Sequence, residues 1–304
     1  METSVQMLRK LFFARICGAL KRIKPHDLIW REGVYGDFTM TIMVGHDFLH
    51  MLGPFFLSLN RTWNKLPSRI IILCDDTVDP SEVANLTQWV PCIELLNIHG
   101  LHQILIKNGL DEILQAKSKF PDIKMIDKLS LLCAFDEENR IYCDLDILWR
   151  KCPFTQIPNI DDMAMAEDIK SSYDMVDFPQ EDLLSLQSHP ALNAGFLYLP
   201  SGWYDHADIQ SLIRSKNEGV WNHFSEQTIV AMSMWRLMVS GRQVHFLERP
   251  WMTFGTEGLV KKHFSGASCI HYTMGSRWDI FPDGYLLYMK AHPFKAIRAL
   301  FSRS

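Results

Sequence analysis

The sequence predicts an α/β protein built on a mainly parallel, doubly wound, Rossmann-like sheet with helices on both faces. Short apolar and β-branched runs alternate with longer segments in which apolar residues recur at helical spacing. Several short runs are apolar throughout, as is typical of strands buried on both faces of a parallel sheet. With 304 residues, 47% of them hydrophobic and 22% charged, the composition excludes a disordered, collagen-like or low-complexity chain.

The first half of the chain shows this alternation clearly. Residues 39–44 form a β-branched, apolar run that predicts the opening strand, and 51–59 carry apolar residues at helical spacing. The run 69–74 is apolar after Arg69 and is followed directly by Asp75, as expected of a buried strand. The same reasoning predicts helices at 77–89, 101–117 and 125–135, and strands at 92–97 and 140–143.

The second half continues the pattern with a predicted helix at 225–238. Further strands are predicted at 163–166, 196–199, 243–247 and 268–272. In doubly wound sheets ligands bind beyond the carboxyl ends of the strands. Functional groups are therefore expected where predicted strands end, at Val44, Cys74, Cys143 and Ala166.

Two carboxylates, Asp144 and Asp146, directly follow the apolar strand predicted at 140–143. Hard oxygen ligands of this kind suit Mg²⁺ or Mn²⁺, because substrate phosphates and water complete the metal shell. An acidic turn that only solvates the strand end would look similar, and phosphatases of the haloacid-dehalogenase kind also place Asp-x-Asp after a strand. Those phosphatases have small, flexible residues next, whereas 147–149 is aliphatic and aromatic, so the flanks favour a metal site of another kind.

Asn193 and Gly195 precede the strand predicted at 196–199. A glycine at such a position lets the backbone approach a ligand closely, and the asparagine can hydrogen-bond that ligand. Taken alone, the pair is equally typical of a tight turn entering a strand.

The third motif begins at His271, at the end of the strand predicted at 268–272, and continues through Gly275 to Arg277. An imidazole is a suitable third ligand for Mn²⁺, and an arginine can neutralise a diphosphate. A lone histidine at a strand end is more often a hydrogen-bonded polar group, but the glycine and arginine that follow favour a binding site.

These motifs, in this order, resemble those of the nucleotide-sugar-dependent glycosyltransferases with the GT-A fold, and among them the retaining family 8 type. The resemblance covers roughly 38–280. It implies that Asp144, Asp146 and His271 bind Mn²⁺, or Mg²⁺, which bridges the diphosphate of the donor. The closing motif with Gly275 and Arg277 is then expected to grip that diphosphate.

The resemblance also assigns residues around the sugar. Lys128, on the helix before the Asp-x-Asp strand, takes the place of a basic residue that contacts the donor, and Asn193 takes the place of the residue that grips the sugar. Glu226 and Gln227 correspond to an Asp-Gln-Asp segment, in which the glutamine lies near the reacting carbon. Independently of the resemblance, Asp47 follows the first predicted strand and is a candidate for base or ribose contact, although a solvated loop acid is as good an interpretation.

The implied function is metal-dependent transfer of a hexose from a nucleotide-diphosphate sugar, a UDP-sugar, to a hydroxyl of a glycan or glycolipid, with retention. Glu226 could instead act as a base in an inverting reaction, so the stereochemistry stays open. The alternatives are a metal-dependent phosphohydrolase that uses the Asp-x-Asp pair and a non-catalytic nucleotide-sugar-binding protein.

Three segments are predicted: a basic amphipathic helix with its connector at 1–32, a GT-A glycosyltransferase domain at 33–284, and a basic helix at 285–304. The net charge is −4, with the basic residues concentrated at the two ends, so nucleic-acid binding is not expected. The N-terminal helix could lie on an anionic membrane surface or pack against the body.

The 7 cysteines occur mostly inside apolar runs and form no CxxC pair. This pattern is typical of reduced, buried thiols and predicts a cytoplasmic protein, peripheral on the inner face of the membrane if the N-terminal helix binds lipid.

Overall fold

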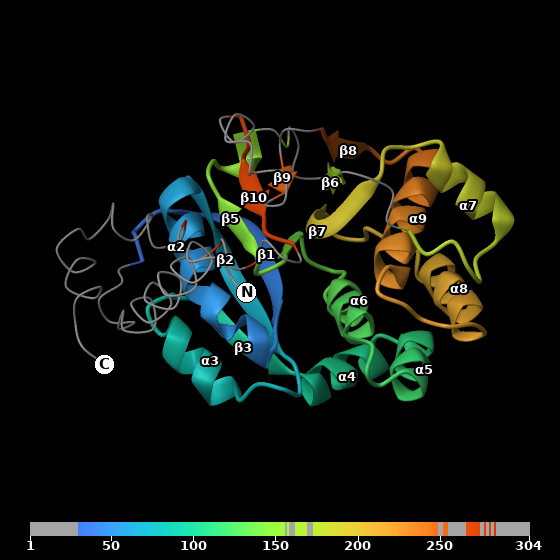
Figure 1. Cartoon of the computed structure of the whole chain (residues 1–304), viewed down its shortest axis with the longest axis horizontal. Helices are drawn as coiled ribbons and strands as arrows, with labels where there is room; N and C mark the ends of the chain where they lie inside the picture. The colour runs from blue at the N-terminus through green and yellow to red at the C-terminus, as the bar shows by residue number, and fades with distance from the viewer. Residues whose placement is uncertain are drawn as a thin grey trace, which may run out of the picture.

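The computed structural model describes residues 30–155, 157, 162–168, 173–248, 252–254, 266–273, 277, 280 and 283. They contain a seven-stranded sheet with the strand order β3-β2-β1-β4-β7-β6-β8 (Figure 1). Only β7 runs antiparallel to its neighbours, so the predicted mainly parallel sheet is confirmed. The strands are β1 (Val34–Val44), β2 (Lys65–Cys74), β3 (Ile93–Asn97), β4 (Arg140–Cys143), β6 (Met163–Glu167), β7 (Leu192–Leu199) and β8 (Val244–Leu247).

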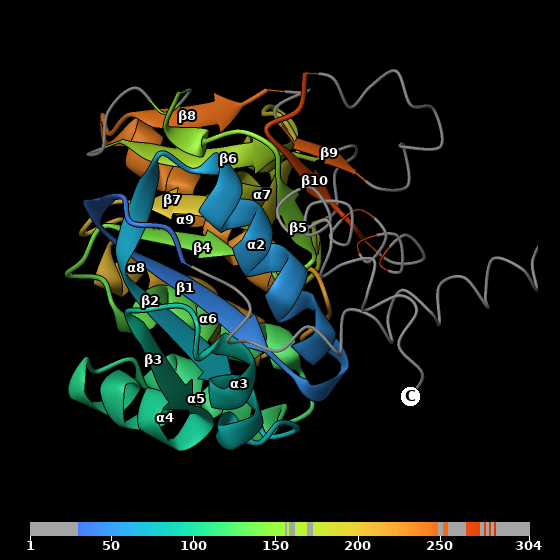
Figure 2. The same ribbon diagram turned by 90° about the vertical axis from the view of Figure 1, so that its left-hand side faces the viewer.

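Helices cover both faces of the sheet, as predicted for a doubly wound fold. One face carries α2 (Leu52–Thr62) and α3 (Pro80–Thr87), and α2 crosses the strands on the viewer's side in Figure 2. The helices that pack on the other face are α4 (Ile98–Lys107), α5 (Asp111–Lys119), α6 (Lys124–Ala134), α7 (Gln180–Gln187), α8 (His206–Asn217) and α9 (Ser225–Val239). Two short 3₁₀ helices, η2 (His46–Met51) and η3 (Pro153–Thr155), complete the set.

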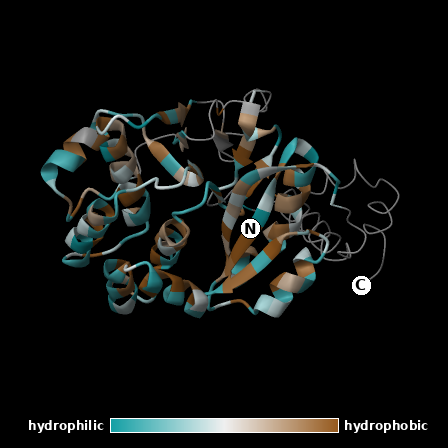
Figure 3. Ribbon diagram, turned by 180° about the vertical axis from the view of Figure 1, so that it is seen from behind, coloured by the Kyte–Doolittle hydropathy of each residue, from teal (hydrophilic) through white to brown (hydrophobic). Residues whose placement is uncertain are grey.

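Side chains on opposite faces of the sheet belong to two separate hydrophobic cores. Along β2, Ile70, Ile72 and Cys74 pack with α2, whereas Leu73 packs with the helices of the opposite face. Figure 3 shows hydrophobic residues concentrated on the central strands, with mixed character along the helices. Burial on both faces explains why these strands read as continuous apolar runs.

A second, three-stranded sheet lies on the α2 face. It has the order β5-β10-β9, formed by β5 (Ile147–Trp149), β10 (Cys269–His271) and β9 (Met252–Phe254). The Ser58 hydroxyl on α2 fixes β5, because it accepts a hydrogen bond from the Trp149 amide at 3.0 Å and donates one to the Phe55 carbonyl. The small sheet matters for function because Asp146 immediately precedes β5 and His271 ends β10.

The helix predicted at 101–117 was wrong as a single element. The structure has α4 and α5 instead, separated by Gly109, whose φ of +68° terminates α4 in a left-handed conformation. The amide of Leu110 donates to the Leu105 carbonyl across this end. The elements α7, α8, β5 and β9 had not been predicted. Of these, α7, β5 and β9 are short, whereas α8 buries Ile209, Leu212 and Ile213 at helical spacing, so its signal was present in the sequence.

The predicted terminal helices lie outside the described residues, so the division at 32 and 284 stays a prediction. Among the residues that the structure does describe, none of the helices has the length and hydrophobicity needed to cross a bilayer.

Ser58→Ala should lower the free energy of unfolding by about 1–3 kcal/mol, because the buried Trp149 amide loses this acceptor. Urea denaturation measures the change. Ser215→Ala, at an exposed serine of α8 whose hydroxyl also bonds its own helix, should shift stability by less than about 0.5 kcal/mol. Equal losses in the two variants would contradict the role given to Ser58.

Candidate active site

The polar residues singled out in the sequence gather at the edge of the sheet where the parallel strands end. The strands β1, β4 and β6 deliver their carboxyl ends there. Since β7 runs antiparallel to β4, with Cys143 opposite Phe196, it brings its first residues to the same edge. Asp144 follows β4 and Asp47 follows β1, so these two predicted residues lie beyond strand ends as expected, and their function stays a prediction.

Asp144, Asp146 and His271 form a group of three potential metal ligands. One ligand atom from each lies within 4.8 Å of those of the other two. The His271 Nε2 atom is 3.1 Å from Asp146 Oδ1 and 3.8 Å from Asp144 Oδ2. The antiparallel pairing of β10 with β5, in which His271 lies opposite Ile147, brings the histidine beside the two aspartates. Two carboxylates and an imidazole are a donor set that fits Mn²⁺ or Mg²⁺.

Lys128 of α6 is a buried cation beneath this group. Its Nζ atom is 3.3 Å from Asp144 Oδ1 and 3.4 Å from Glu226 Oε1, and it lies 4.7 Å from the centre of the Tyr142 ring. Burial opposes protonation of this amine, but Asp144 and Glu226 outweigh it and raise the pKa of Lys128. The lysine is therefore charged, and it links two carboxylates from different elements.

Glu226 lies in the first turn of α9 and is 2% exposed. Burial raises its pKa to about 7, although the nearby Lys128 acts in the opposite direction. Asp144 differs from Glu226 because, besides its contact with Lys128, it accepts a 2.6 Å hydrogen bond from the Tyr142 hydroxyl.

Asp146 is buried and lies beside two basic side chains. It lies beside His271 and accepts a 2.9 Å hydrogen bond from Arg277 Nε. Burial alone would favour the neutral acid, but His271 and Arg277 hold its pKa below the usual value. The pKa of His271 is raised in turn, because the attraction of Asp146 exceeds the penalty of burial. The Arg277 guanidinium also stacks over the Phe48 ring, 5.0 Å from its centre, and the side chain remains 41% exposed.

The segment with Asn193 and Gly195 is not the predicted turn before a strand; it lies inside β7, at an irregularity of the ladder with β6. Met165 is opposite Leu197, and the next residue, Ala166, is opposite Asn193. Such a bulge releases backbone groups from regular pairing and is common beside active sites.

Groups from neighbouring elements form hydrogen bonds with the backbone at the bulge. The Gln227 Oε1 atom accepts from the Ala194 amide at 3.0 Å, and the Asp144 amide donates to the Gly195 carbonyl at 2.8 Å. Asn193 caps the bulge by accepting from the Gly195 amide and donates through Nδ2 to Asp168 at 3.1 Å. The structure therefore brings Asn193 and Gln227 together with the metal-ligand group.

Gly195 is required by close approach. A Cβ atom there would lie 2.6 Å from Cε1 of His271, 2.7 Å from Oδ1 of Asn193 and 3.1 Å from Oδ2 of Asp144. Without a side chain, β7 packs directly against two of the three candidate ligands.

The remaining predicted residues divide into two groups. Asp47 is exposed on η2, directly after β1 and at the same edge of the sheet. Gly275 lies outside the described residues. Asp75, which the sequence showed only as the residue after a strand, also lies at this edge of the sheet. Its Oδ1 atom accepts a hydrogen bond from the Thr77 amide at 2.8 Å. Its Oδ2 atom lies so close to Gly45 that a Cβ atom there would be 2.7 Å away.

Tyr142 was missed entirely. Its apolar strand context indicated only a core residue, and the side chain does pack in the core while its hydroxyl reaches Asp144. The alternation of β4 is the signal that could have found it, because Tyr142 and Asp144 occupy the same face of the extended chain.

No protein-family profile and no curated protein matches this sequence. Solved structures are nevertheless similar in three dimensions. Galactosyltransferase LgtC, in complex with donor and acceptor sugar analogues, matches with a TM-score of 0.51 at 12% identity, covering 81% of this chain and 95% of LgtC. Mouse xyloside xylosyltransferase 1 matches with a TM-score of 0.51 at 11% identity, covering 79% of this chain and 99% of that protein.

The chain has the GT-A glycosyltransferase fold. The bifunctional glycosyltransferase WbbM matches with a TM-score of 0.51 at 12% identity, with 90% of this chain covering 52% of WbbM. The GT-A fold predicted from the sequence is thus confirmed, and the candidate metal ligands lie where β4 and β10 of that fold end.

Gly195→Ala should weaken Mn²⁺ binding by roughly ten- to a hundredfold, because the new methyl group displaces His271 or Asp144. Mn²⁺ titration followed by electron paramagnetic resonance measures the affinity, and circular dichroism checks folding. Gly53→Ala, where a Cβ meets nothing within 4 Å, should leave Mn²⁺ affinity unchanged. Wild-type affinity in a folded Gly195→Ala protein would contradict this geometry.

Proposed function

We propose that this protein is a metal-dependent glycosyltransferase that moves a hexose from a nucleotide-diphosphate sugar, a UDP-sugar, to a hydroxyl of a glycan or glycolipid, with retention. The observation that carries the proposal is the group of Asp144, Asp146 and His271 at the carboxyl edge of a GT-A fold. The similar structures support the same reaction class, since all three are glycosyltransferases and LgtC was crystallised with donor and acceptor sugar analogues.

Asp144, Asp146 and His271 would hold Mn²⁺ or Mg²⁺. When bound, such a cation supplies electrostatic stabilisation of the negative charge that develops on the leaving diphosphate. The protein contributes a preorganised arrangement, because Tyr142 and Lys128 fix Asp144 while Arg277 fixes Asp146.

Arg277 is proposed to contact the diphosphate directly. Its side chain is partly exposed at the site, and its Nε–H bond to Asp146 together with the Phe48 ring sets the plane of the guanidinium. An arginine held in this way can form charge-assisted hydrogen bonds with phosphate oxygens. Titrating Arg277→Met with a nucleoside diphosphate and with the free nucleoside measures this contact, which only the diphosphate should lose.

Lys128 is too deeply buried for a large contact with the donor, and its main contribution is proposed to be charge compensation. Its single positive charge lies between Asp144 and Glu226, which stabilises two acidic groups close to each other in a buried environment. A direct contact between Lys128 and the donor stays a prediction.

Asn193, Gln227 and Glu226 are proposed to surround the transferred sugar. Asn193 and Gln227 hold the β7 bulge, and Asp168 extends this polar wall. A general base must come within hydrogen-bond reach of the acceptor hydroxyl. Glu226 is instead buried against Lys128, which favours the retaining reaction over an inverting one with Glu226 as its base.

Association with a membrane surface is the second part of the proposal. It is supported by the concentration of basic residues at both ends of a chain whose net charge is −4. The protein would then act in the cytoplasm, peripheral on the inner face of the membrane, on a glycolipid acceptor.

The proposed activity predicts that the wild-type protein releases nucleoside diphosphate from one member of a panel of nucleotide sugars, only with Mn²⁺ or Mg²⁺. Asp146→Asn should lower kcat roughly a hundredfold or more, because stabilisation of the leaving group is lost. Asp182→Asn, which removes a carboxylate paired with Arg236 on α9, is the matched control and should retain activity.

The same assay separates the alternatives. Release of phosphate from phosphate monoesters, with nucleotide sugars left intact, would identify a phosphohydrolase. Metal-dependent binding of nucleotide sugars without turnover, with or without added glycans and glycolipids, would identify a binding protein.

The membrane proposal predicts that the full chain co-sediments with phosphatidylserine-containing vesicles at low salt. Deletion of residues 1–24 or raised ionic strength should reduce binding, because exposed charges are screened by salt. Neutral vesicles are the control. If the full chain stays in the supernatant with anionic vesicles at low salt, the acceptor is to be sought among soluble glycans.

A further inference from the structure

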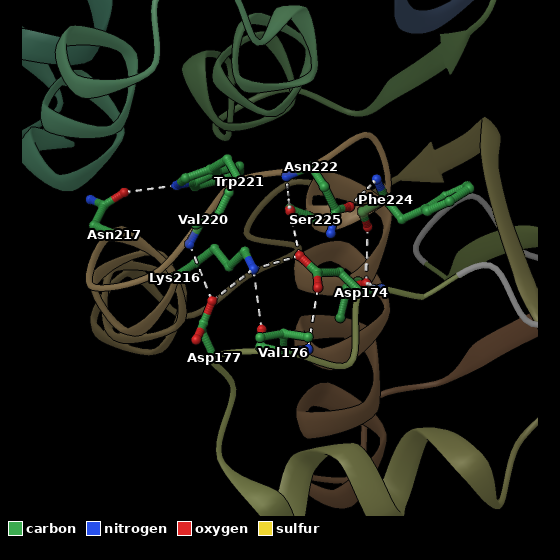
Figure 4. A network of polar contacts seen from close by, with 11 residues as sticks. Asp174, Val176, Asp177, Lys216, Asn217, Val220, Trp221, Asn222, Phe224 and Ser225 are labelled. Atoms are coloured by element: carbon green, nitrogen blue, oxygen red, sulfur yellow. Dashed lines mark hydrogen bonds and ion pairs between the residues drawn. The ribbon is translucent and has the colours of Figure 1, made fainter.

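A buried ion pair behind the candidate site has no part in the proposed chemistry. Lys216 of α8 is fully buried, and its Nζ atom lies 2.6 Å from Asp174 Oδ2 (Figure 4). The ammonium also donates to the Val176 carbonyl at 3.2 Å and lies 3.3 Å from Asp177. Lys216 therefore fastens the loop 173–178 to α8 from inside the protein.

The same loop is bonded to the beginning of α9. The Ser225 hydroxyl donates to Asp174 Oδ2 at 2.6 Å, and the Asp174 amide donates to the Thr228 hydroxyl at 2.7 Å (Figure 4). Ser225 and Thr228 are the residues on either side of Glu226 and Gln227. The loop thus holds the segment that faces the candidate site from both of its ends.

This support matters because α9 has no side-chain cap of its own. Its N-cap position is Phe224, which makes no capping hydrogen bond through its side chain. The first turn of a helix has unpaired amides and a partial positive charge, so it frays unless other groups stabilise it. The carboxylate of Asp174, held by Lys216, lies beside this turn and accepts from the Ser225 hydroxyl, so it holds the turn through a side chain of α9.

A small displacement of this first turn of α9 would change the contacts of Glu226 and Gln227 in the site. Glu226 reaches Lys128 at 3.4 Å, and Gln227 accepts from the Ala194 amide at 3.0 Å in the β7 bulge. The first contact is a buried ion pair and the second is a hydrogen bond, and both begin within one turn of the network. Removal of one partner of a buried ion pair leaves an uncompensated charge, so Lys216 and Asp174 hold each other in place.

We propose that Lys216 is a positioning residue for the Glu226–Gln227 segment, acting through Asp174, Ser225 and Thr228. This inference rests on the proposed glycosyl transfer for its effect on rate, and on the hydrogen-bond network alone for its effect on α9. Lys216 lies outside the group of candidate metal ligands and affects the reaction by holding the first turn of α9 in register with Lys128 and β7.

The test compares Lys216→Met with Arg236→Met in the full chain. Arg236 also anchors α9, but through Asp182 and away from the site. Lys216→Met should lower kcat for the nucleotide sugar that the wild type turns over by about ten- to a hundredfold, with unchanged affinity for its nucleoside diphosphate and Mn²⁺. Arg236→Met should leave kcat near wild type. A wild-type kcat in folded Lys216→Met, or a loss equal to the unfolded fraction, would overturn the proposal.

Thr228→Val serves as a second variant, because it removes one of the two links between the loop and α9 and leaves the ion pair intact. It should lower kcat in the same direction, so the proposal remains testable if Lys216→Met fails to fold. An unchanged kcat in Thr228→Val would count against it.

Hydrogen exchange separates this inference from the proposed function. The amides of 225–230 should exchange faster in Thr228→Val and Lys216→Met than in wild type, and at the wild-type rate in Arg236→Met. If the wild type turns over no nucleotide sugar, the proposed function fails, and faster exchange confined to these amides still supports the positioning role. Unchanged exchange in both variants overturns it.

Discussion

The buried charge of Lys128 is the interaction on which the site depends. It lies between Asp144 of β4 and Glu226 of α9, so one ammonium compensates carboxylates from two elements that are far apart in the sequence. Without it, two acids would lie close together in an environment that penalises charge, and the pKa of Glu226, which burial already raises to about 7, would rise further. Tyr142 completes the arrangement in two ways. Its ring lies against the Lys128 ammonium, and its hydroxyl donates a hydrogen bond to the Asp144 carboxylate.

The reversed direction of β7 makes this arrangement possible. A strand parallel to β4 would bring its last residues to the edge, whereas antiparallel β7 brings its first ones, and its bulge turns Asn193 and Gly195 towards the ligands. Each released backbone group then finds a partner from another part of the site, such as Gln227 or Asp144. The bulge interrupts the regular pairing of β7 with β6, and contacts with Gln227 and Asp144 hold its backbone in place.

Much of this could be predicted from the sequence, and the remainder depends on packing. Asp144 and Asp146 come from one motif and His271 from another, and the ends of their predicted strands suggested a common edge. The structure joins the two motifs differently, through the antiparallel pairing of β10 with β5 in the second sheet. Asn193 was expected in a turn because a polar residue followed by glycine is common to turns and bulges; only the pairing with β6 distinguishes them. The Lys128–Glu226 contact was not predicted, since it depends on how α6 and α9 pack against each other on one face of the sheet, which no local pattern encodes.

The two ends of α9 are held by different side-chain contacts to other parts of the chain. Its residues 225–234 are all buried, so no apolar stripe along the helix marks its rotation and axial position. Directional contacts must supply that information: Arg236 to Asp182 at one end, and Ser225 and Thr228 to Asp174 at the other. Because Lys216 neutralises Asp174 in a fully buried position, the contact at the N-terminal end tolerates little displacement before a charge is left unpaired. The position of Glu226 is thus set as much by a lysine on α8 as by its partner on α6.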